Sequence, residues 1–120
     1  MLYVLRRTDG TTDFARGTLV EADGAVRWLS GDAFTVRATG RWTSAASGVT
    51  YPAGWRVDVP GAGIALDVAP ALADQEDRST LAGGVVYWEG AVRLRDAAGH
   101  EAGEGYVELT GYGKDTRPPI

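Results

Sequence analysis

Short runs of β-favouring residues, each ended by a turn signal after about 8–12 residues, recur along the whole of this 120-residue chain. The 17 glycines and five prolines that mark these turns are spread along the sequence and are not gathered in one linker. No stretch carries a long apolar repeat at helical spacing. We therefore expect a single all-β domain rather than a helical bundle.

The first half of the chain contains four such runs. Asp-Gly pairs follow two of them, at residues 9–10 and 23–24. Glycine adopts a positive φ at little cost, so these pairs suit the tight turns that join neighbouring antiparallel strands. The four runs cover residues 2–7, 14–21, 25–29 and 34–39.

Alternation of apolar and polar residues is clearest in the second half. Trp55, Val57 and Val59 alternate with polar residues, which is typical of a strand with one face in water. A longer connection, residues 70–84, then precedes the longest run. The other expected strands are residues 64–68, 85–95 and 104–112, with a hairpin loop at 96–101.

These runs amount to about eight strands and no helix. Successive hairpins favour an antiparallel sandwich or an up-and-down β-barrel. We prefer the barrel, because closure removes exposed strand edges and eight strands enclose a space that can just hold a small ligand. The expected domain is an antiparallel up-and-down barrel over residues 1–113, followed by a flexible tail at 114–120.

The charge balance excludes two classes of partner. The chain carries 12 basic and 16 acidic residues, which gives a net charge of −4. An acidic protein is a poor partner for nucleic acid or for an anionic membrane surface. No apolar run approaches the roughly 20 residues that a membrane span requires. The start of the chain lacks a basic segment and a cleavage site, so we expect no signal peptide and favour a cytoplasmic location.

The sequence offers little material for metal or cofactor chemistry. It has no cysteine, and its single histidine, His100, cannot form a multi-histidine site. The acidic segment 74–77 could in principle bind a hard cation, but it lacks the spacing of a calcium loop, so we interpret it as a solvated acidic loop. The glycine pairs at 61–63 and 103–105 do not open a helix and are not phosphate loops. We expect neither a metal nor a cofactor.

Aromatic residues are the main candidates for a functional site, and most of them lie in the last two-thirds of the chain. Aromatic side chains commonly fill the cores of β-proteins. The alternative is that they line a cavity, where stacking and apolar burial suit a flat or polyene ligand. On this alternative, the candidate ligand-binding residues are Trp42, Tyr51, Trp55, Tyr87, Trp88 and Tyr112.

Two expected strands each place a carboxylate among aromatic or hydroxyl groups. Glu89 shares a strand face with Tyr87, and Glu108 shares one with Tyr106 and Tyr112. One interpretation is a solvated outer face on which the carboxylates pair with arginines. The other is a polar wall inside the barrel, where a partly desolvated glutamate gains the raised pKa of a general acid. The candidate catalytic residues are Glu89, Glu108 and Tyr106.

Five short strings occur in an order that resembles a known family. They are Trp42-Thr43-Ser44, the stretch 51–55 (YPAGW), Asp74-Gln75-Glu76, the stretch 87–90 (YWEG) and the stretch 105–112 (GYVELTGY). Together with the opening hairpin, they resemble the C-terminal half of the AttH-like / carotenoid 1,2-hydratase (hydroxyneurosporene synthase) family. The resemblance covers nearly all of residues 2–112.

This resemblance implies a lipocalin-like barrel that is normally the second of two tandem barrels in one polypeptide. The family includes carotenoid hydratases, cyclases of the Diels–Alderase kind and secreted hydrolases, and its common theme is an apolar, often polyene-like small molecule. The implied partners are therefore such a ligand, together with an N-terminal barrel or a second copy of the chain. Hydration needs a carboxylic acid beside aromatic faces, and cyclisation needs a shaped cavity, so neither requires a cofactor.

Two functions remain open at this point. The first is a lipocalin-like domain that binds an apolar small molecule and supports acid-assisted or shape-driven catalysis. The second is a non-catalytic half-domain that pairs with another barrel or with itself. Hydrolysis in the literal sense is disfavoured, because the chain has one histidine and no Gly-x-Ser-x-Gly motif.

Overall fold

The computed structural model describes residues 1–79 and 84–113, and this part of the chain is all β apart from one 3-10 turn, η1 (Pro60–Ala62). Eight of its strands have at least four residues, in agreement with the predicted number. The expected tail, 114–120, lies outside the described residues. The strands are β1 (Leu2–Arg6), β2 (Thr12–Val20), β3 (Val26–Ser30), β4 (Thr35–Ala38), β5 (Arg41–Thr43), β6 (Thr50–Pro52), β7 (Trp55–Val59), β8 (Ile64–Pro70), β9 (Glu76–Asp77), β10 (Tyr87–Arg95) and β11 (Glu101–Leu109).

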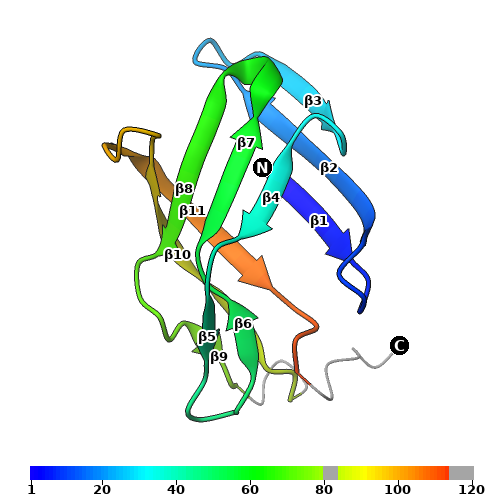
Figure 1. Cartoon of the computed structure of the whole chain (residues 1–120), viewed down its shortest axis with the longest axis vertical. Coiled ribbons are helices and arrows are strands. Elements are labelled where there is room, and N and C mark those ends of the chain that lie inside the picture. The colour runs from blue at the N-terminus through cyan, green and yellow to red at the C-terminus, as the bar shows by residue number, and fades with distance from the viewer. Residues whose placement is uncertain (80–83, 114–120) are drawn as a thin grey trace.

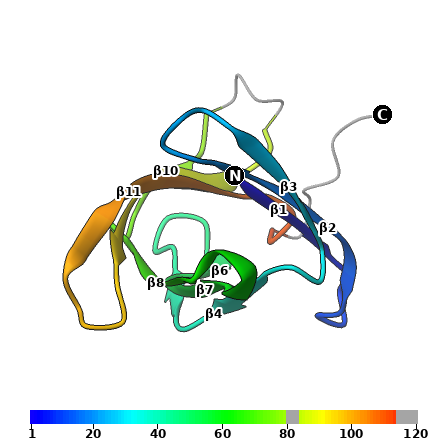
Figure 2. The ribbon, with the colours of Figure 1, turned by 90° about the horizontal axis from the view of Figure 1, so that it is seen from above.

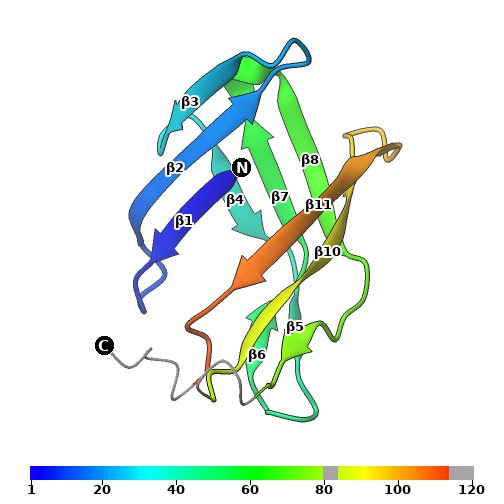
Figure 3. The same ribbon diagram turned by 180° about the vertical axis from the view of Figure 1, so that it is seen from behind.

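All strand pairs are antiparallel and form three sheets. The first has the order β1-β2-β3, the second has the order β11-β10-β8-β7-β4 with β9 added on β10, and the third is the β5–β6 pair. The second sheet curls strongly, so that β10 and β11 lie across from β4 and β7 (Figures 1 and 2). From behind, the first sheet and β11 face the viewer with β4 and β7 visible between them (Figure 3), and no strand of the first sheet pairs with β11 in the described part of the chain. The predicted all-β, antiparallel, lipocalin-like fold is confirmed.

The predicted Asp-Gly turns occur where the sequence places them. Gly10 and Gly24 have φ values of 86° and 88°. In each turn the preceding aspartate accepts a hydrogen bond from a backbone N–H two residues further on, at 2.9 Å from both Asp9 and Asp23. The hairpin predicted at 96–101 likewise joins β10 to β11. Local chemistry alone therefore determines these three connections.

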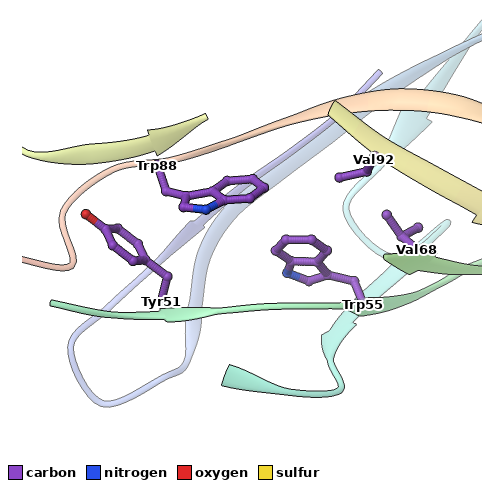
Figure 4. Close-up of a cluster of buried hydrophobic side chains, with 5 residues drawn as sticks. All are labelled: Tyr51, Trp55, Val68, Trp88 and Val92. Atoms are coloured by element: carbon purple, nitrogen blue, oxygen red, sulfur yellow. The ribbon is translucent and has the colours of Figure 1, made fainter. Parts of the chain in front are cut away.

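The interior contains two clusters of buried side chains. The first is aromatic and lies between β10 and the β6–β7–β8 side of the molecule (Figure 4). The second consists of smaller side chains and lies under the β1–β2–β3 sheet. Val36 of β4 packs against both clusters. The first cluster consists of Tyr51, Trp55, Val68, Trp88 and Val92, and the second of Ala15, Leu29, Phe34 and Val59. Within the described ranges, the structure has no helix that is long and apolar enough to span a bilayer.

Candidate functional site

Strand β10 separates the predicted site residues onto two faces, because successive side chains of a strand point in opposite directions. Trp88 and Val92 point into the core and are 2% exposed. Tyr87 and Glu89 lie on the opposite face and are half-buried. The two-face pattern predicted from the sequence of this strand is confirmed.

The aromatic residues on the inner face pack against one another. The ring centroids of Trp55 and Trp88 are 6.2 Å apart, and the planes are inclined at 55° (Figure 4). The indole Nε1 of Trp88 donates a hydrogen bond of 2.9 Å to the carbonyl of Ala73. Tyr51 is only 1% exposed. These three predicted ligand-binding residues are therefore constituents of the hydrophobic core.

Two further predicted ligand-binding residues continue this group of rings towards the surface. Trp42 stacks on Tyr51 at a centroid distance of 6.2 Å, with an interplanar angle of 19°. Tyr112 lies 5.9 Å from Tyr51 and is 44% exposed. Buried Tyr51 therefore connects half-buried Trp42 and exposed Tyr112 in a row of aromatic rings that leads from the core to solvent.

Glu76 of β9 is a buried carboxylate that accepts four hydrogen bonds from side chains. Its own side chain has no exposed surface. Oε1 accepts from the Ser44 hydroxyl at 2.7 Å and from the Arg78 guanidinium at 2.9 Å. Oε2 accepts from the hydroxyls of Ser47 at 2.6 Å and Tyr51 at 2.8 Å. These four donors replace the water that the buried carboxylate has lost, and they stabilise its charge.

The donors determine the ionisation of this carboxylate. Burial alone would raise the pKa of Glu76, but the hydrogen bonds from Ser47, Arg78, Ser44 and Tyr51 outweigh it and lower the pKa to about 2. Burial and the bond to Glu76 together raise the pKa of the Tyr51 phenol above its ordinary value. Glu76 is therefore ionised and Tyr51 neutral at neutral pH.

Sequence reasoning missed this cluster. The prediction of a solvated acidic loop at 74–77 is wrong for Glu76, because the side chains of another hairpin cover it. The sequence did contain one signal for this cluster, because the short strings that carry the family resemblance occur together in one chain. Ser44, Tyr51 and Glu76 each belong to one of those strings, and the fold brings the three together.

The predicted catalytic residues lie together on the outer face of β10 and β11. Glu89 and Glu108 are directly opposite each other across the two strands. The Tyr87 hydroxyl lies 3.2 Å from both Asp77 Oδ2 and Glu89 Oε1. Burial, together with these carboxylates, raises the pKa of Tyr87 to about 12. Tyr106 is 66% exposed, and partial burial followed by the charge of Glu89 raises its pKa as well.

A polar hollow of about 520 Å³ opens to solvent beside these residues. Glu89 and Tyr106 line it from the sheet, and residues 75–79 form the rest of its wall. This face points away from the hydrophobic core, which agrees with the interpretation that these carboxylates lie on a solvated outer face.

Among the described residues, no three His, Cys, Asp or Glu side chains lie close enough together to hold a metal ion. His100 is exposed in the β10–β11 turn, 3.5 Å from Asp96.

The outer face of the β1–β2–β3 sheet is apolar and aromatic, a feature that the sequence alone did not indicate. The rings of Tyr3 and Phe14 meet edge to face at 6.0 Å, and the guanidinium of Arg16 lies 5.1 Å from the Phe14 centroid. Trp28 is 83% exposed. We call this surface the aromatic outer face; its exposed apolar members are Tyr3, Leu5, Phe14, Val20, Val26 and Trp28.

Comparison with known proteins places the chain in a family and finds similar solved structures. Residues 1–112 match the model of the AttH-like family. A crystal structure of a protein from Nitrosomonas europaea, provisionally assigned as AttH, superposes with a TM-score of 0.80 at 34% sequence identity. The match covers 92% of this chain but 34% of that protein, so the chain spans about a third of its relative. No curated protein matches the sequence.

Proposed function

Because this chain belongs to the AttH-like family, we propose that it is a lipocalin-like domain that binds an apolar, polyene-like small molecule within a larger, two-barrel protein. The observation that supports this proposal is the aromatic row of Trp42, Tyr51 and Tyr112, which leads from the core to the surface. Flat aromatic faces bind conjugated or apolar ligands by stacking and by burial, without any charged group.

The location of the row supports a binding position at its exposed end. Trp55 and Trp88 fill the space between the sheets, so in this arrangement a ligand has access to the outer end of the row and not to an empty lumen. Tyr51 is buried, its hydroxyl is engaged by Glu76 and Trp42 stacks on its ring, so Tyr51 positions the neighbouring rings and does not itself present a free face to the ligand. Tyr112, at the exposed end, contributes the most accessible ring of the three.

Any catalysis depends on a second surface. Protonation of an alkene carbon needs a neutral carboxylic acid shielded from water. Glu89, Tyr106 and Glu108 lie on an outer face, so the second barrel or a second copy must cover that face before the acid can act. The Glu89→Gln variant of the two-barrel protein should keep its fold and lose turnover. Unchanged turnover would remove Glu89 from the mechanism.

The binding proposal is tested with the apolar fluorophore N-phenyl-1-naphthylamine. Titration into the chain should give a saturable rise in probe emission and quench the tryptophans. Tyr112→Ala should weaken binding by about tenfold, the contribution of one aromatic contact. Tyr3→Ala, which removes an exposed ring from the opposite region, is the matched control and should leave affinity unchanged. A response that does not saturate, in this chain and in the two-barrel protein alike, would contradict the proposal.

The aromatic outer face favours a second candidate function, that of an interaction half-domain. Exposed contiguous apolar surface on a sheet is typical of protein–protein contact, and tryptophan, tyrosine and arginine are the residues that dominate such contacts. The covering surface would be the companion barrel or a second copy. Size-exclusion chromatography with light scattering should show concentration-dependent self-association of the chain. A monodisperse monomer at millimolar concentration that also fails to bind the companion barrel would contradict this function.

A further inference from the structure

The segment 41–52, which we call the distal hairpin, consists of β5, β6 and the turn between them. It continues the β4–β7 hairpin along the chain, but it forms a separate two-stranded sheet (Figure 1). The two sheets meet where Thr39 donates to the Gly54 carbonyl and Ala53 donates to the Gly40 carbonyl, both at 2.9 Å. The distal hairpin is therefore attached to the large sheet through a narrow junction.

Both strands of the junction carry a glycine that the geometry requires. Gly54 has a φ of 86°, and a Cβ there would lie 2.8 Å from the Thr39 hydroxyl. A Cβ on Gly40 would lie 2.7 Å from the Ala53 carbonyl oxygen. Since glycine permits backbone conformations that other residues resist, paired glycines at a junction have the properties of a hinge.

The distal hairpin covers one end of the aromatic core. Tyr51 is part of the buried cluster with Trp55 and Trp88 (Figure 4). Trp42 packs against that cluster. Movement of the distal hairpin away from β10 would expose the rings of the two buried tryptophans. These rings would then extend the aromatic row on which ligand binding is proposed.

The contact between the distal hairpin and β9 centres on Glu76. Three of the four side-chain hydrogen bonds to this carboxylate come from the distal hairpin, through Ser44 and Ser47 in the turn region and through Tyr51 in β6. The fourth comes from Arg78, next to β9. Glu76 itself is held by the pairing of β9 with β10, where it lies opposite Trp88.

The attachment combines the packing of Tyr51 and Trp42 with these hydrogen bonds, and its polar part can open reversibly. Water replaces the hydrogen bonds of a released carboxylate and released hydroxyls, so each bond contributes only a modest net free energy. We propose that the distal hairpin is a flap, hinged at Gly40 and Gly54 and latched by Glu76, that opens to admit an apolar ligand onto Trp55 and Trp88. Its role in ligand entry rests on the proposed function, whereas the opening itself does not.

The opening is tested by amide hydrogen exchange on the full chain without ligand. Ser47→Ala removes one latch donor, together with the local acceptor of the Val49 N–H at 3.2 Å. Exchange in residues 41–52 other than Val49 should accelerate by about tenfold or more, while β1 and β2 are unaffected. Ser47→Thr retains a hydroxyl and should restore slow exchange. Thr50→Ala is the matched control: it removes the exposed Thr43–Thr50 hydroxyl contact of 2.8 Å in the same hairpin without touching Glu76. Unchanged exchange in Ser47→Ala, or a uniform increase over all strands, would overturn the flap.

Stopped-flow mixing with N-phenyl-1-naphthylamine separates the flap from the binding proposal. If both hold, Ser47→Ala raises the association rate constant of the probe by the same factor as the exchange rate. Faster exchange in a protein that never binds the probe supports the flap and contradicts the binding function. Saturable binding with unchanged exchange and association rates supports the binding function and overturns the flap.

Discussion

The two tryptophans at positions 88 and 28 lie in strands of similar pattern, yet one is 2% and the other 83% exposed. Trp88 points from β10 into a cluster that β7, β8 and the distal hairpin close. Trp28 points from β3 to the outside of a three-stranded sheet on which nothing packs in the described part of the chain. Residue type therefore favours a strand, whereas burial depends on which other element covers that strand's face.

The polar groups of the two regions differ in the same way. On the β1–β2 side, Arg7 and Asp13 form an ion pair in solvent, with side-chain exposures of 66% and 49%. On the β9 side, Glu76 is enclosed and bound by four donors. Exposed ion pairs contribute little to stability, whereas a buried charge is costly as soon as one partner is lost. The β9–β10 region should therefore be much more sensitive to substitution than the β1–β3 sheet.

The largest expected difference between the regions concerns the two tryptophans. Trp88→Ala should lower the free energy of unfolding by about 3–5 kcal/mol, because it empties a packed site and removes the bond to Ala73. Trp28→Ala should change it by less than about 0.5 kcal/mol. Urea unfolding followed by far-UV circular dichroism measures both. A small effect at Trp88 combined with lost probe binding would show that it is a pocket wall and not core.

A smaller effect is expected from Glu76→Gln, about 2 kcal/mol at neutral pH, because the amide cannot accept all four bonds. The pH dependence has a definite sign. The pKa of Glu76 is lowered from 4.5 to about 2 in the folded protein, so its contribution is complete above about pH 4.5 and is lost as the pH falls towards 2.

Stability curves recorded between pH 2 and pH 7 should therefore be flatter for Glu76→Gln than for the natural sequence. Glu101→Gln is the control, because the Glu101 side chain is 75% exposed. Parallel curves for the natural chain and Glu76→Gln would contradict the buried, hydrogen-bonded environment of Glu76.

Gly90→Ala should cost about 1–2 kcal/mol. A Cβ on the buried Gly90 would collide with the amide of Gln75, which accepts from the Ala91 N–H at 2.9 Å and donates to the Ala91 and Leu72 carbonyls at 3.0 Å. Displacing this amide removes the partner of the Ala91 N–H in β10, whereas the Ala91 carbonyl still accepts from Ala71. Gly61→Ala is the matched control, since a Cβ there meets nothing within 4 Å. Equal melting temperatures for the two variants would show that Gln75 is not a structural constraint.

The smallest effect lies on the outer face of β10 and β11, where Glu108 is directly opposite Glu89 and Glu104 is directly opposite Arg93. Like charges across a strand pair are destabilising, so Glu108→Gln should raise stability by about 0.2–0.5 kcal/mol at low salt. Glu104→Gln should lower it slightly, because it removes an attraction. Both changes should shrink at 1 M salt. If both variants changed the free energy of unfolding in the same direction, the charges across the strand pair would not be the cause.

Much of the fold follows from local sequence. The alternation at 55–59 and 85–95 predicted strands β7 and β10, and the Asp-Gly pairs predicted the turns on either side of β2. These features depend on the period of a strand and on the positive φ of glycine, which act within a few residues. The division of Trp88 and Glu89 onto opposite faces follows from the same period.

The candidate site was only partly predictable. The sequence identified the aromatic residues but could not distinguish Tyr51, which is buried, from Tyr112, which is exposed. It also treated Glu76 as part of a solvated loop, because the donors Ser44 and Ser47 are about 30 residues away along the chain. A burial pattern that depends on contacts between distant segments has no local signature.

The order of apolar and polar residues by itself determined that this chain forms antiparallel strands, where they turn and which side chains share a face. Which faces meet depends on long-range packing, and that packing encloses Glu76 under a hairpin and leaves Trp28 in solvent. The physical reason is that dihedral preferences and strand periodicity are properties of neighbouring residues. Desolvation, in contrast, is a property of the space between surfaces that the chain brings together from afar.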